Sequence, residues 1–182
     1  DEIEKIVKID HLTGEIIDAP SSTVIYPAVH YIAYDENEDE TISMIRQELK
    51  NRVAELENDN KILESQRLQQ RVKYDIEMIK EMGYCSGIEN YSRIIERRPV
   101  GSPPATLLDY FQEDFLTVID ESHVTIPQLN GMYHGDASRK KTLIDYGFRL
   151  PCAKDNRPLK SEEFFNKVGQ KIYISATPAE FE

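Results

Sequence analysis

Long hydrophobic runs, paired cysteines and metal-ligand spacings are what this 182-residue sequence has least of. No stretch approaches the roughly 20 apolar residues of a membrane span, and no basic-then-apolar leader is present, so we expect neither a membrane nor a secreted protein. The two cysteines, Cys85 and Cys152, form no CxxC, and the four histidines show no HxxxH or HExxH spacing. We therefore expect reduced thiols, a cytoplasmic location and no structural metal.

Basic residues are also outnumbered by acidic ones: the sequence has 22 Lys and Arg and 33 Asp and Glu, which gives a net charge of −11. Proteins that bind polyanions usually carry a basic footprint, so this balance argues against nucleic acid. The imbalance is uneven, however: residues 1–64 hold 16 acids and 6 bases, whereas residues 65–182 hold 17 acids and 16 bases. The acidic charge argues against DNA binding only for the first third of the chain, which we expect to contact a protein partner.

The sequence begins with short runs that are typical of strands. Residues 3–9 and 15–17 flank a turn at Gly14, which predicts a hairpin. A further extended run, residues 23–26, stops at Pro27. These pieces indicate the closing strands of a small β-rich unit.

From about Glu38 the apolar residues recur every three or four positions, which predicts amphipathic helices. The polar run at 58–60 interrupts the pattern, and Gly83 ends it, so we expect two helices joined by a tight turn. A plain helical hairpin is the favoured interpretation. A dimerising coiled coil is the alternative, disfavoured because the heptad pattern breaks near Asn60 and Arg67.

The second half of the chain alternates between strand-like and helix-like segments. Residues 115–121 and 171–174 predict strands buried on both faces, as in a parallel sheet. Short helices are expected over 89–97, from Asp136 as N-cap to Tyr146, and from Ser161 to about Gly169. Strand, helices and strand in this order indicate an α/β topology.

The first of these strands ends in the acidic pair Asp120-Glu121, and the second ends in Ser175-Ala176-Thr177. Open α/β sheets bind ligands beyond the carboxyl ends of their strands. An Asp there can hold Mg²⁺ and a neighbouring Glu can orient or deprotonate a water, as a phosphate-hydrolysing site requires. Either strand end alone is weak evidence, and the two together favour a functional site.

Longer runs of sequence carry a family resemblance. The run from Asp120 to Tyr133, which includes DESHVTIPQL and GMY, closely resembles the Walker B region of the UvrB family, the damage-verifying ATPases of bacterial nucleotide excision repair. The similarity extends through GFRLP, DNRPL and SATP, and upstream through EMGYCSGIENYSR, LLDYF and LTGE. It therefore spans nearly the whole chain.

The resemblance implies a fold class and an order of domains. It implies an α/β fold, part of a helicase-like P-loop NTPase motor domain with a helical insertion, preceded by the end of a small β-rich domain. Residues 1–27 would be the last strands of the UvrA-interacting domain. Residues 28–113 would form the helical hairpin and an insertion beside a DNA channel, and 114–182 would be part of the first motor domain.

The resemblance also implies roles for the residues at the two strand ends, with ATP and Mg²⁺ as cofactors. Asp120 would help to place Mg²⁺ on the ATP phosphates, and Glu121 would activate the attacking water. His123 would lie near the nucleotide and sense its state. Ser175 and Thr177 would couple hydrolysis to domain motion.

A further implication of the resemblance concerns DNA, one strand of which passes through a channel in this family. Tyr31 and Tyr91 would stack on bases, while Arg93, Arg97 and Arg98 would meet phosphates. The alternatives are plain: Tyr31 as a packing aromatic, and the two adjacent arginines as a solvated helix end.

The sequence also departs from the family pattern, because it contains no G-x-x-x-x-G-K-[ST] loop to hold the β- and γ-phosphates. We therefore expect this chain alone to be inactive and the full-length protein to be a DNA-binding ATP hydrolase that works with UvrA, UvrC and damaged DNA. The alternative is a protein- or DNA-docking module without catalysis, as in the degenerate UvrB-like module of the transcription-repair coupling factor. The intact Asp120-Glu121 and Ser175-Ala176-Thr177 speak against it.

Overall fold

A computed structural model of the chain describes residues 3–23, 38–112 and 114–180. The chain divides into two compact units, residues 1–30 and 31–182. Tyr31 and nearly all of the extended run at 23–26 lie outside the described residues. The domain boundaries predicted at residues 27 and 113 stay predictions. Within the described ranges, none of the helices combines the length and apolar character needed to cross a membrane.

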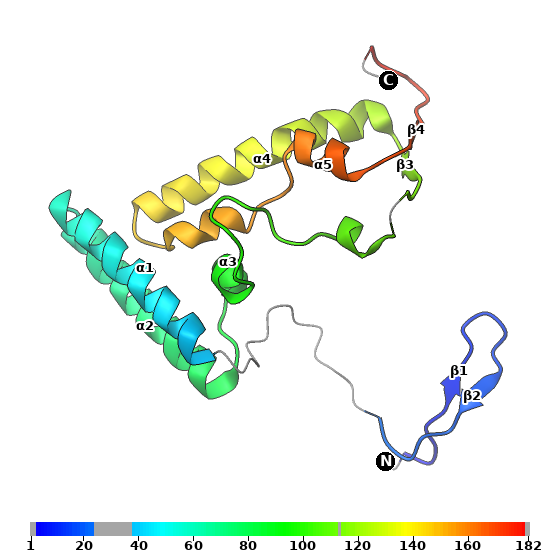
Figure 1. Cartoon of the computed structure of the whole chain (residues 1–182), viewed down its shortest axis with the longest axis horizontal. Coiled ribbons are helices and arrows are strands. Elements are labelled where there is room, and N and C mark those ends of the chain that lie inside the picture. The colour runs from blue at the N-terminus through cyan, green and yellow to red at the C-terminus, as the bar shows by residue number, and fades with distance from the viewer. Residues whose placement is uncertain (1–2, 24–37, 113, 181–182) are drawn as a thin grey trace. The chain divides into compact units, whose positions relative to one another are not determined.

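The first unit contains the predicted hairpin, which the structure confirms. Strands β1 (Lys8–Ile9) and β2 (Ile16–Asp18) pair antiparallel (Figure 1). The Asp10 carboxylate accepts hydrogen bonds from the backbone N–H groups of Leu12 and Thr13, at 2.8 and 2.9 Å. These backbone hydrogen bonds hold the pKa of Asp10 below its usual range and fix the turn between the strands.

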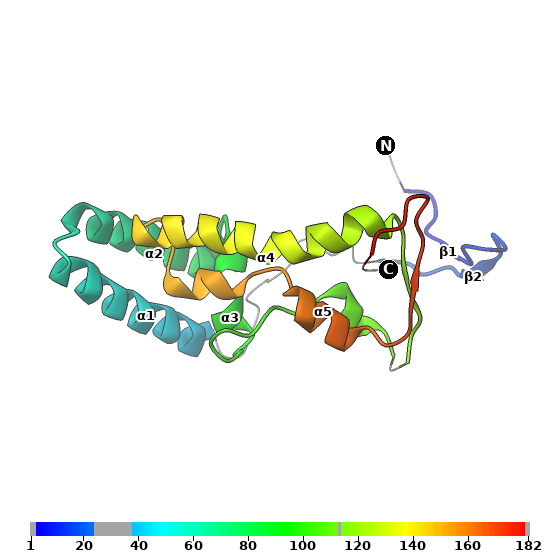
Figure 2. The same cartoon turned by 90° about the horizontal axis from the view of Figure 1, so that it is seen from above.

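The second unit begins with the predicted helical hairpin, also confirmed. Helices α1 (Glu38–Asn58) and α2 (Ile62–Met82) lie side by side (Figures 1 and 2). Gly83 ends α2 in a left-handed conformation and donates its N–H to the Ile79 carbonyl, as a C′ glycine does. The residues between the helices form most of the core, namely Ile42, Ile45, Leu49, Leu56, Leu68, Val72, Ile76 and Ile79.

Short helical elements extend this core. They are η1 (Ile88–Tyr91), α3 (Ser92–Ile95) and η3 (Pro151–Asp155), which contact one another and, through α3, helix α1. Cys85 and Cys152 are both buried free thiols within this core. Burial raises the pKa of the Cys85 thiol to about 12, so it stays protonated at neutral pH.

Helix α4 (Ser122–Asp145) differs from the prediction. We expected a helix beginning at Asp136, but the helix starts fourteen residues earlier and includes Pro127. Asp136 lies in its middle and forms ion pairs with Arg139 and Lys140, at 2.9 and 2.7 Å. Its carboxylate therefore serves side-chain pairing at i+3 and i+4 instead of an N-cap.

The far end of α4 is tied to α2. Gly147 follows the helix with φ +70°, and a Cβ there would collide with the backbone carbonyl of Glu64. Arg67 of α2 donates to the Tyr146 carbonyl at 2.6 Å, and its guanidinium lies over the Phe148 ring at 4.4 Å. Only glycine permits this close approach.

The remaining elements are η2 (Leu107–Tyr110), β3 (Thr117–Ile119), α5 (Ser161–Lys167) and β4 (Lys171–Tyr173). The strands β3 and β4 are parallel, as predicted.

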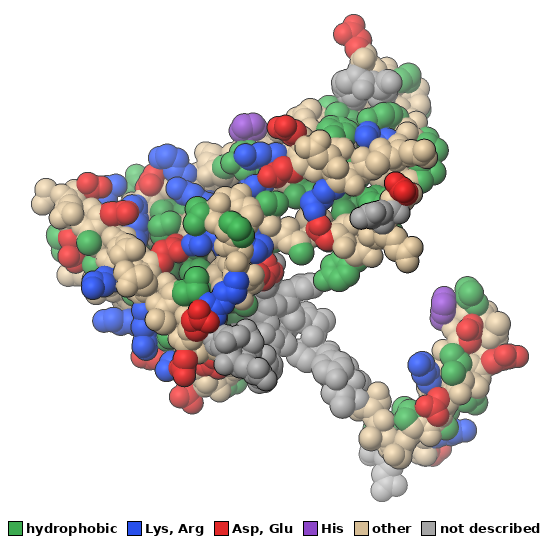
Figure 3. Space-filling model, viewed as in Figure 1, with side chains coloured by type: hydrophobic (Ala, Val, Ile, Leu, Met, Phe, Trp, Pro, Cys, Tyr) green, Lys and Arg blue, Asp and Glu red, His purple; other side chains and the backbone are tan. Residues whose placement is uncertain are grey.

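The predicted burial of these strands on both faces is wrong: Ile119 is 4% exposed, but Val118 is 53% and Ile172 46% exposed. Because successive side chains point to opposite faces, one face of the pair is covered and the other is open. Figure 3 shows hydrophobic side chains at the surface in this region.

Candidate active site

The register of β3 and β4 brings their carboxyl ends together. Thr117, Val118 and Ile119 lie opposite Lys171, Ile172 and Tyr173. Beyond the strands, the Ile174 N–H donates to the Ile119 carbonyl at 2.9 Å, and the Ser122 N–H donates to the Ile174 carbonyl at 3.0 Å. The acidic pair after β3 and the Ser-Ala-Thr segment after β4 therefore leave the same edge of the pair.

The acidic pair occupies a sharp turn into α4. Glu121 has φ 44° and ψ 49°, a left-handed conformation that is costly for a residue with a Cβ. The Asp120 carboxylate accepts the Glu121 N–H at 3.0 Å, and the Asp120 carbonyl accepts the Thr125 hydroxyl at 2.9 Å. These contacts hold the turn, and both acidic side chains face solvent.

His123 connects the two strand ends. Its Nδ1 lies 2.8 Å from the Ser175 hydroxyl oxygen and 3.4 Å from a carboxylate oxygen of Glu121. The Ser175 oxygen also accepts the Thr177 N–H at 3.1 Å. This chain of contacts links both segments through side chains in addition to the backbone.

The chemistry open to these residues follows from which atoms meet. A serine, a histidine and a carboxylate suggest a nucleophile relay, but that relay needs the acid and the serine on opposite ring nitrogens. Here both contact Nδ1, so the arrangement does not activate Ser175. It is suited to orienting His123 and linking it to Ser175.

The acidic pair has the oxygen ligands that Mg²⁺ prefers, but it is not a complete cage. Among residues 3–23, 38–112 and 114–180, no group of three or more His, Cys, Asp or Glu is placed to hold a metal ion. Mg²⁺ in nucleotide sites is commonly held by one or two carboxylates, water and substrate phosphates. One exposed carboxylate at Asp120 fits that requirement.

Comparison with known proteins adds an independent observation. A family model described as the UvrB third helical domain matches residues 36–97, which include α1, α2, η1 and α3. Over all 182 residues the chain is 58% identical to UvrABC system protein B of Mycobacterium bovis and of Clostridium beijerinckii, and 57% identical to that of Geobacillus kaustophilus. Over its whole length the chain is similar to a segment of UvrABC system protein B. It covers 25%, 28% and 28% of these three relatives, about a quarter of their length.

Tyr91 lies in the helical core. It is 5% exposed, and its hydroxyl donates to the Asp75 carboxylate at 2.7 Å. Burial, followed by the Asp75 charge, raises the pKa of Tyr91 above its ordinary value. The ring is therefore covered by protein in this conformation and offers no face to a base.

Arg93 lies at the centre of a largely buried ion-pair network. Its guanidinium contacts the carboxylates of Glu48 and Asp155, the latter at 2.9 Å. Glu48 also accepts the Cys152 N–H, and Asp155 accepts the Gly101 N–H at 3.1 Å. Arg93 thus joins α1, α3 and η3, and the structure does not bring it together with the acidic pair.

The two following arginines also have partners in the helical unit. Arg97, with φ 55°, pairs with Glu40 of α1 at 3.0 Å. Arg98 pairs with Glu96 and donates to the Ser102 carbonyl at 2.7 Å. The prediction of a solvated helix end does not describe Arg98, whose side chain is 14% exposed.

The sequence interpretation missed the Glu48–Arg93–Asp155 network. Its members are 45 and 62 residues apart, and no local pattern marks residues at such separations as partners. It also missed a cationic rim around a groove on the α1–α2 hairpin. The available signal was the spacing of Arg46 and Lys50, four residues apart on one helix.

Proposed function

We propose that this chain contributes part of the ATP-hydrolysing site of a UvrB-family protein that verifies DNA damage in nucleotide excision repair. The proposed fold context is a helicase-like P-loop motor domain with α1 and α2 as a helical insertion. ATP and Mg²⁺ are the proposed cofactors, and UvrA, UvrC and damaged DNA the proposed partners. The proposed location is the cytoplasm.

The observation that carries this proposal is the shared edge of β3 and β4. The 2.8 Å contact between His123 and Ser175 joins the residues after one strand to those after the other. Crevices at the carboxyl ends of parallel strands are the usual ligand sites of α/β proteins. Two strand ends linked in this way support a nucleotide site better than either does alone.

Within the proposal, each acidic residue has a separate task. Asp120 would hold Mg²⁺, which supplies charge neutralisation at the nucleotide phosphates when bound. Glu121 would accept a proton from the attacking water. His123 would lie near the nucleotide, and its Nδ1 contacts with Glu121 and Ser175 would make its orientation depend on both.

Ser175 and Thr177 are proposed to couple this site to motion. The Ser175 oxygen contacts His123 and the Thr177 N–H, so a shift of the imidazole would change the hydrogen bonding of the Ser-Ala-Thr segment. We expect Ser175→Ala to reduce ATP turnover less than the acidic variants do and to abolish loading onto DNA. Wild-type loading by that variant would contradict the coupling role.

For DNA, Tyr31 remains a proposed base contact. Tyr91, Arg93, Arg97 and Arg98 were also predicted to contact DNA. Each has partners within the helical unit, so contact with DNA would require it to exchange them. These partners support a role for the four residues in maintaining the shape of the unit beside the proposed channel.

The test is ATP turnover by the full-length protein carrying Asp120→Asn or Glu121→Gln. We expect each to lose on the order of 10²-fold in phosphate release, because each removes a group that places charge or moves a proton at the reacting centre. Glu162→Gln, an exposed acid in α5, is the matched control and should retain full turnover. Near-normal turnover in both acidic variants would overturn the proposal.

The alternative is a docking module without catalysis, as in the coupling factor. Docking does not require Asp120-Glu121 or Ser175-Ala176-Thr177, and both are intact. Identities of 55–58% over the whole chain to proteins named UvrABC system protein B also disfavour it.

A further inference from the structure

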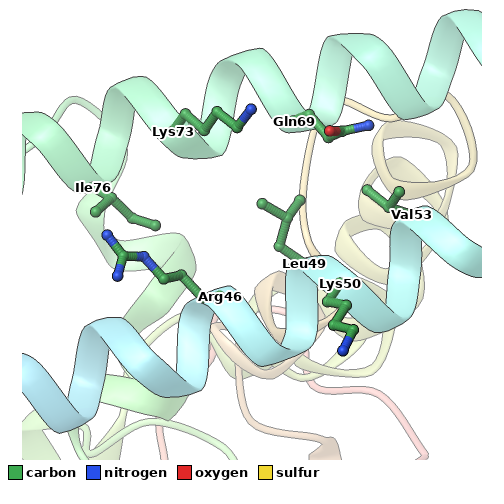
Figure 4. A pocket seen from close by; sticks show the side chains of 7 residues that line it. All are labelled: Arg46, Leu49, Lys50, Val53, Gln69, Lys73 and Ile76. Carbon is green, nitrogen blue, oxygen red and sulfur yellow. The ribbon is translucent and has the colours of Figure 1, made fainter.

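A groove runs between α1 and α2, away from the strand pair. Leu49 and Val53 of α1 and Ile76 of α2 provide its apolar walls, and the cavity volume is about 440 Å³ (Figure 4). Gln69 is the uncharged polar residue of the lining. A cavity of this size accommodates two or three aliphatic side chains of a partner.

The rim of this groove is entirely basic. Arg46 and Lys50 project from α1, and Lys73 from α2 on the opposite side (Figure 4). None of the described residues that line the groove is acidic, although the chain carries a net charge of −11. Figure 3 shows blue and red side chains mixed over the visible face of the helical unit. The absence of acids from the groove lining is therefore a local feature and not a consequence of composition.

The rim cations Arg46, Lys50 and Lys73 differ from two other cations of the hairpin in whether they form ion pairs. Arg52 pairs with Glu55 at 2.7 Å, and Arg71 pairs with Asp75 at 3.0 Å. By contrast, the three rim side chains are exposed and form no ion pair with any residue in the described part of the chain. Unpaired cations beside an apolar groove provide charge complementarity for an anionic partner.

We propose that this groove docks an acidic amphipathic helix of a protein partner. The lining extends over the eight residues of α1 from Arg46 to Val53, a rise of about 10 Å, which matches about two turns of a partner helix. Apolar residues of the partner at i, i+3 or i+4, and i+7 would enter the groove, and flanking carboxylates would meet the rim.

The lining also argues against a nucleic-acid strand as the occupant. Single-stranded nucleic acid is held by aromatic platforms as well as cations, and stacking on such platforms supplies much of its affinity. In the part of the chain that the structure describes, the groove is lined by aliphatic residues, Gln69 and the rim cations, without an aromatic side chain. Its apolar surface is suited to Leu or Ile side chains.

The test uses a fluorescently labelled helical peptide of about four turns, with Leu at i, i+3 and i+7 and Glu at flanking positions. Its binding to the full chain is measured by fluorescence anisotropy, beside a peptide with every Glu replaced by Lys and one with every Leu replaced by Ser. We expect saturable binding of the acidic peptide alone, weakened by salt.

Charge reversal locates the site. Lys73→Glu should weaken peptide binding about fivefold to tenfold, because it replaces an attraction at the rim by a repulsion. Lys154→Glu is the matched control, since Lys154 is exposed, lies in η3 and does not line the groove. Both substitutions are at exposed side chains, and circular dichroism of the two variants checks that the helices are retained.

The outcomes separate the possible occupants. Salt-sensitive binding that Lys73→Glu weakens and Lys154→Glu does not would support the proposal. Absence of saturable binding, or equal affinity of the two variants, would overturn it. A single-stranded oligonucleotide that binds through Lys73 when the peptide does not would overturn it in favour of nucleic acid. Self-association of the chain that Lys73→Glu abolishes, without peptide binding, would overturn it in favour of a second copy.

Discussion

The helical core and the β3–β4 edge distribute charge in opposite ways. In the core, Arg93 lies between Glu48 and Asp155 with 12% of its side chain exposed, and Tyr91 donates to buried Asp75. At the strand edge, Glu121 is 63% exposed. Polar groups that are buried and paired stabilise one conformation, whereas exposed carboxylates remain available to a ligand. A charged residue predicted to contact DNA, such as Arg93, can therefore stabilise the fold, while the carboxylates of a short turn remain exposed to solvent.

The largest expected effect is the loss of Arg93. Arg93→Ala would leave Glu48 and Asp155 largely buried without their shared cation, and we expect a loss of about 3 kcal/mol in the free energy of unfolding. Arg139→Ala is the control, because the Arg139 side chain is 65% exposed and its pair with Asp136 should contribute below about 0.5 kcal/mol. Urea denaturation measures the free energy of unfolding of both variants. Equal midpoints for the two variants would contradict the stabilising role of Arg93.

A smaller effect is expected at Tyr91. Tyr91→Phe keeps the ring but removes the donor to Asp75, which is 2% exposed, so we expect a loss of about 1–2 kcal/mol in stability. Tyr110→Phe, at a ring that is 83% exposed, should change the stability very little. If Tyr91 is structural, the DNA affinity of the full-length protein should be unchanged in Tyr91→Phe. Reduced affinity with unchanged stability would show the opposite.

The smallest expected effect depends on pH and concerns the Arg157–Glu163 pair. Two hydrogen bonds from Arg157, at 2.7 and 2.8 Å, lower the pKa of Glu163 from 4.5 to about 2. Because the pKa is lower in the folded state, the pair stabilises the fold fully above about pH 4.5 and progressively less as the pH falls toward 2. We expect Glu163→Gln to lose on the order of 1 kcal/mol at neutral pH and to flatten the fall in stability over that range.

The exposed neighbour Glu162 provides the control for this pH dependence. Glu162→Gln should keep the wild-type slope of stability between pH 4.5 and 2, because Glu162 takes no part in the two hydrogen bonds that lower the pKa of Glu163. Thermal unfolding at several pH values compares the three proteins. Identical slopes for wild type and Glu163→Gln would show that the pair is not a source of acid sensitivity.

Periodicity and turn residues predicted much of the fold. The three- and four-residue spacing gave α1 and α2, Gly83 gave the end of α2, and the two apolar runs gave β3 and β4 as parallel strands. These features depend on neighbours in sequence. The predicted start of α4, with Asp136 as its N-cap, was wrong, because the helix begins at Ser122 and continues through Pro127, although proline normally disfavours a helix interior.

In the candidate site, too, some features follow from the sequence pattern and others depend on tertiary packing. That Asp120 and Ser175 leave one sheet edge follows from the strand pattern, because parallel strands end on the same side. The contact of both Glu121 and Ser175 with one nitrogen of His123 depends on the left-handed turn at Glu121, which no sequence pattern marks. The partners of Arg93 depend on segments 45 and 62 residues away, so tertiary packing determines them.

Helix α4 is held at its C-terminal end by contacts with α2. Its 24 residues correspond to about 36 Å, from the strand edge at Ser122 to the close contact of Gly147 with α2. Pro127, in its second turn, lacks the backbone donor that would stiffen the helix there. The His123 carbonyl, four residues before Pro127, therefore receives no helical hydrogen bond from position 127, and we expect any bending of α4 to occur next to His123.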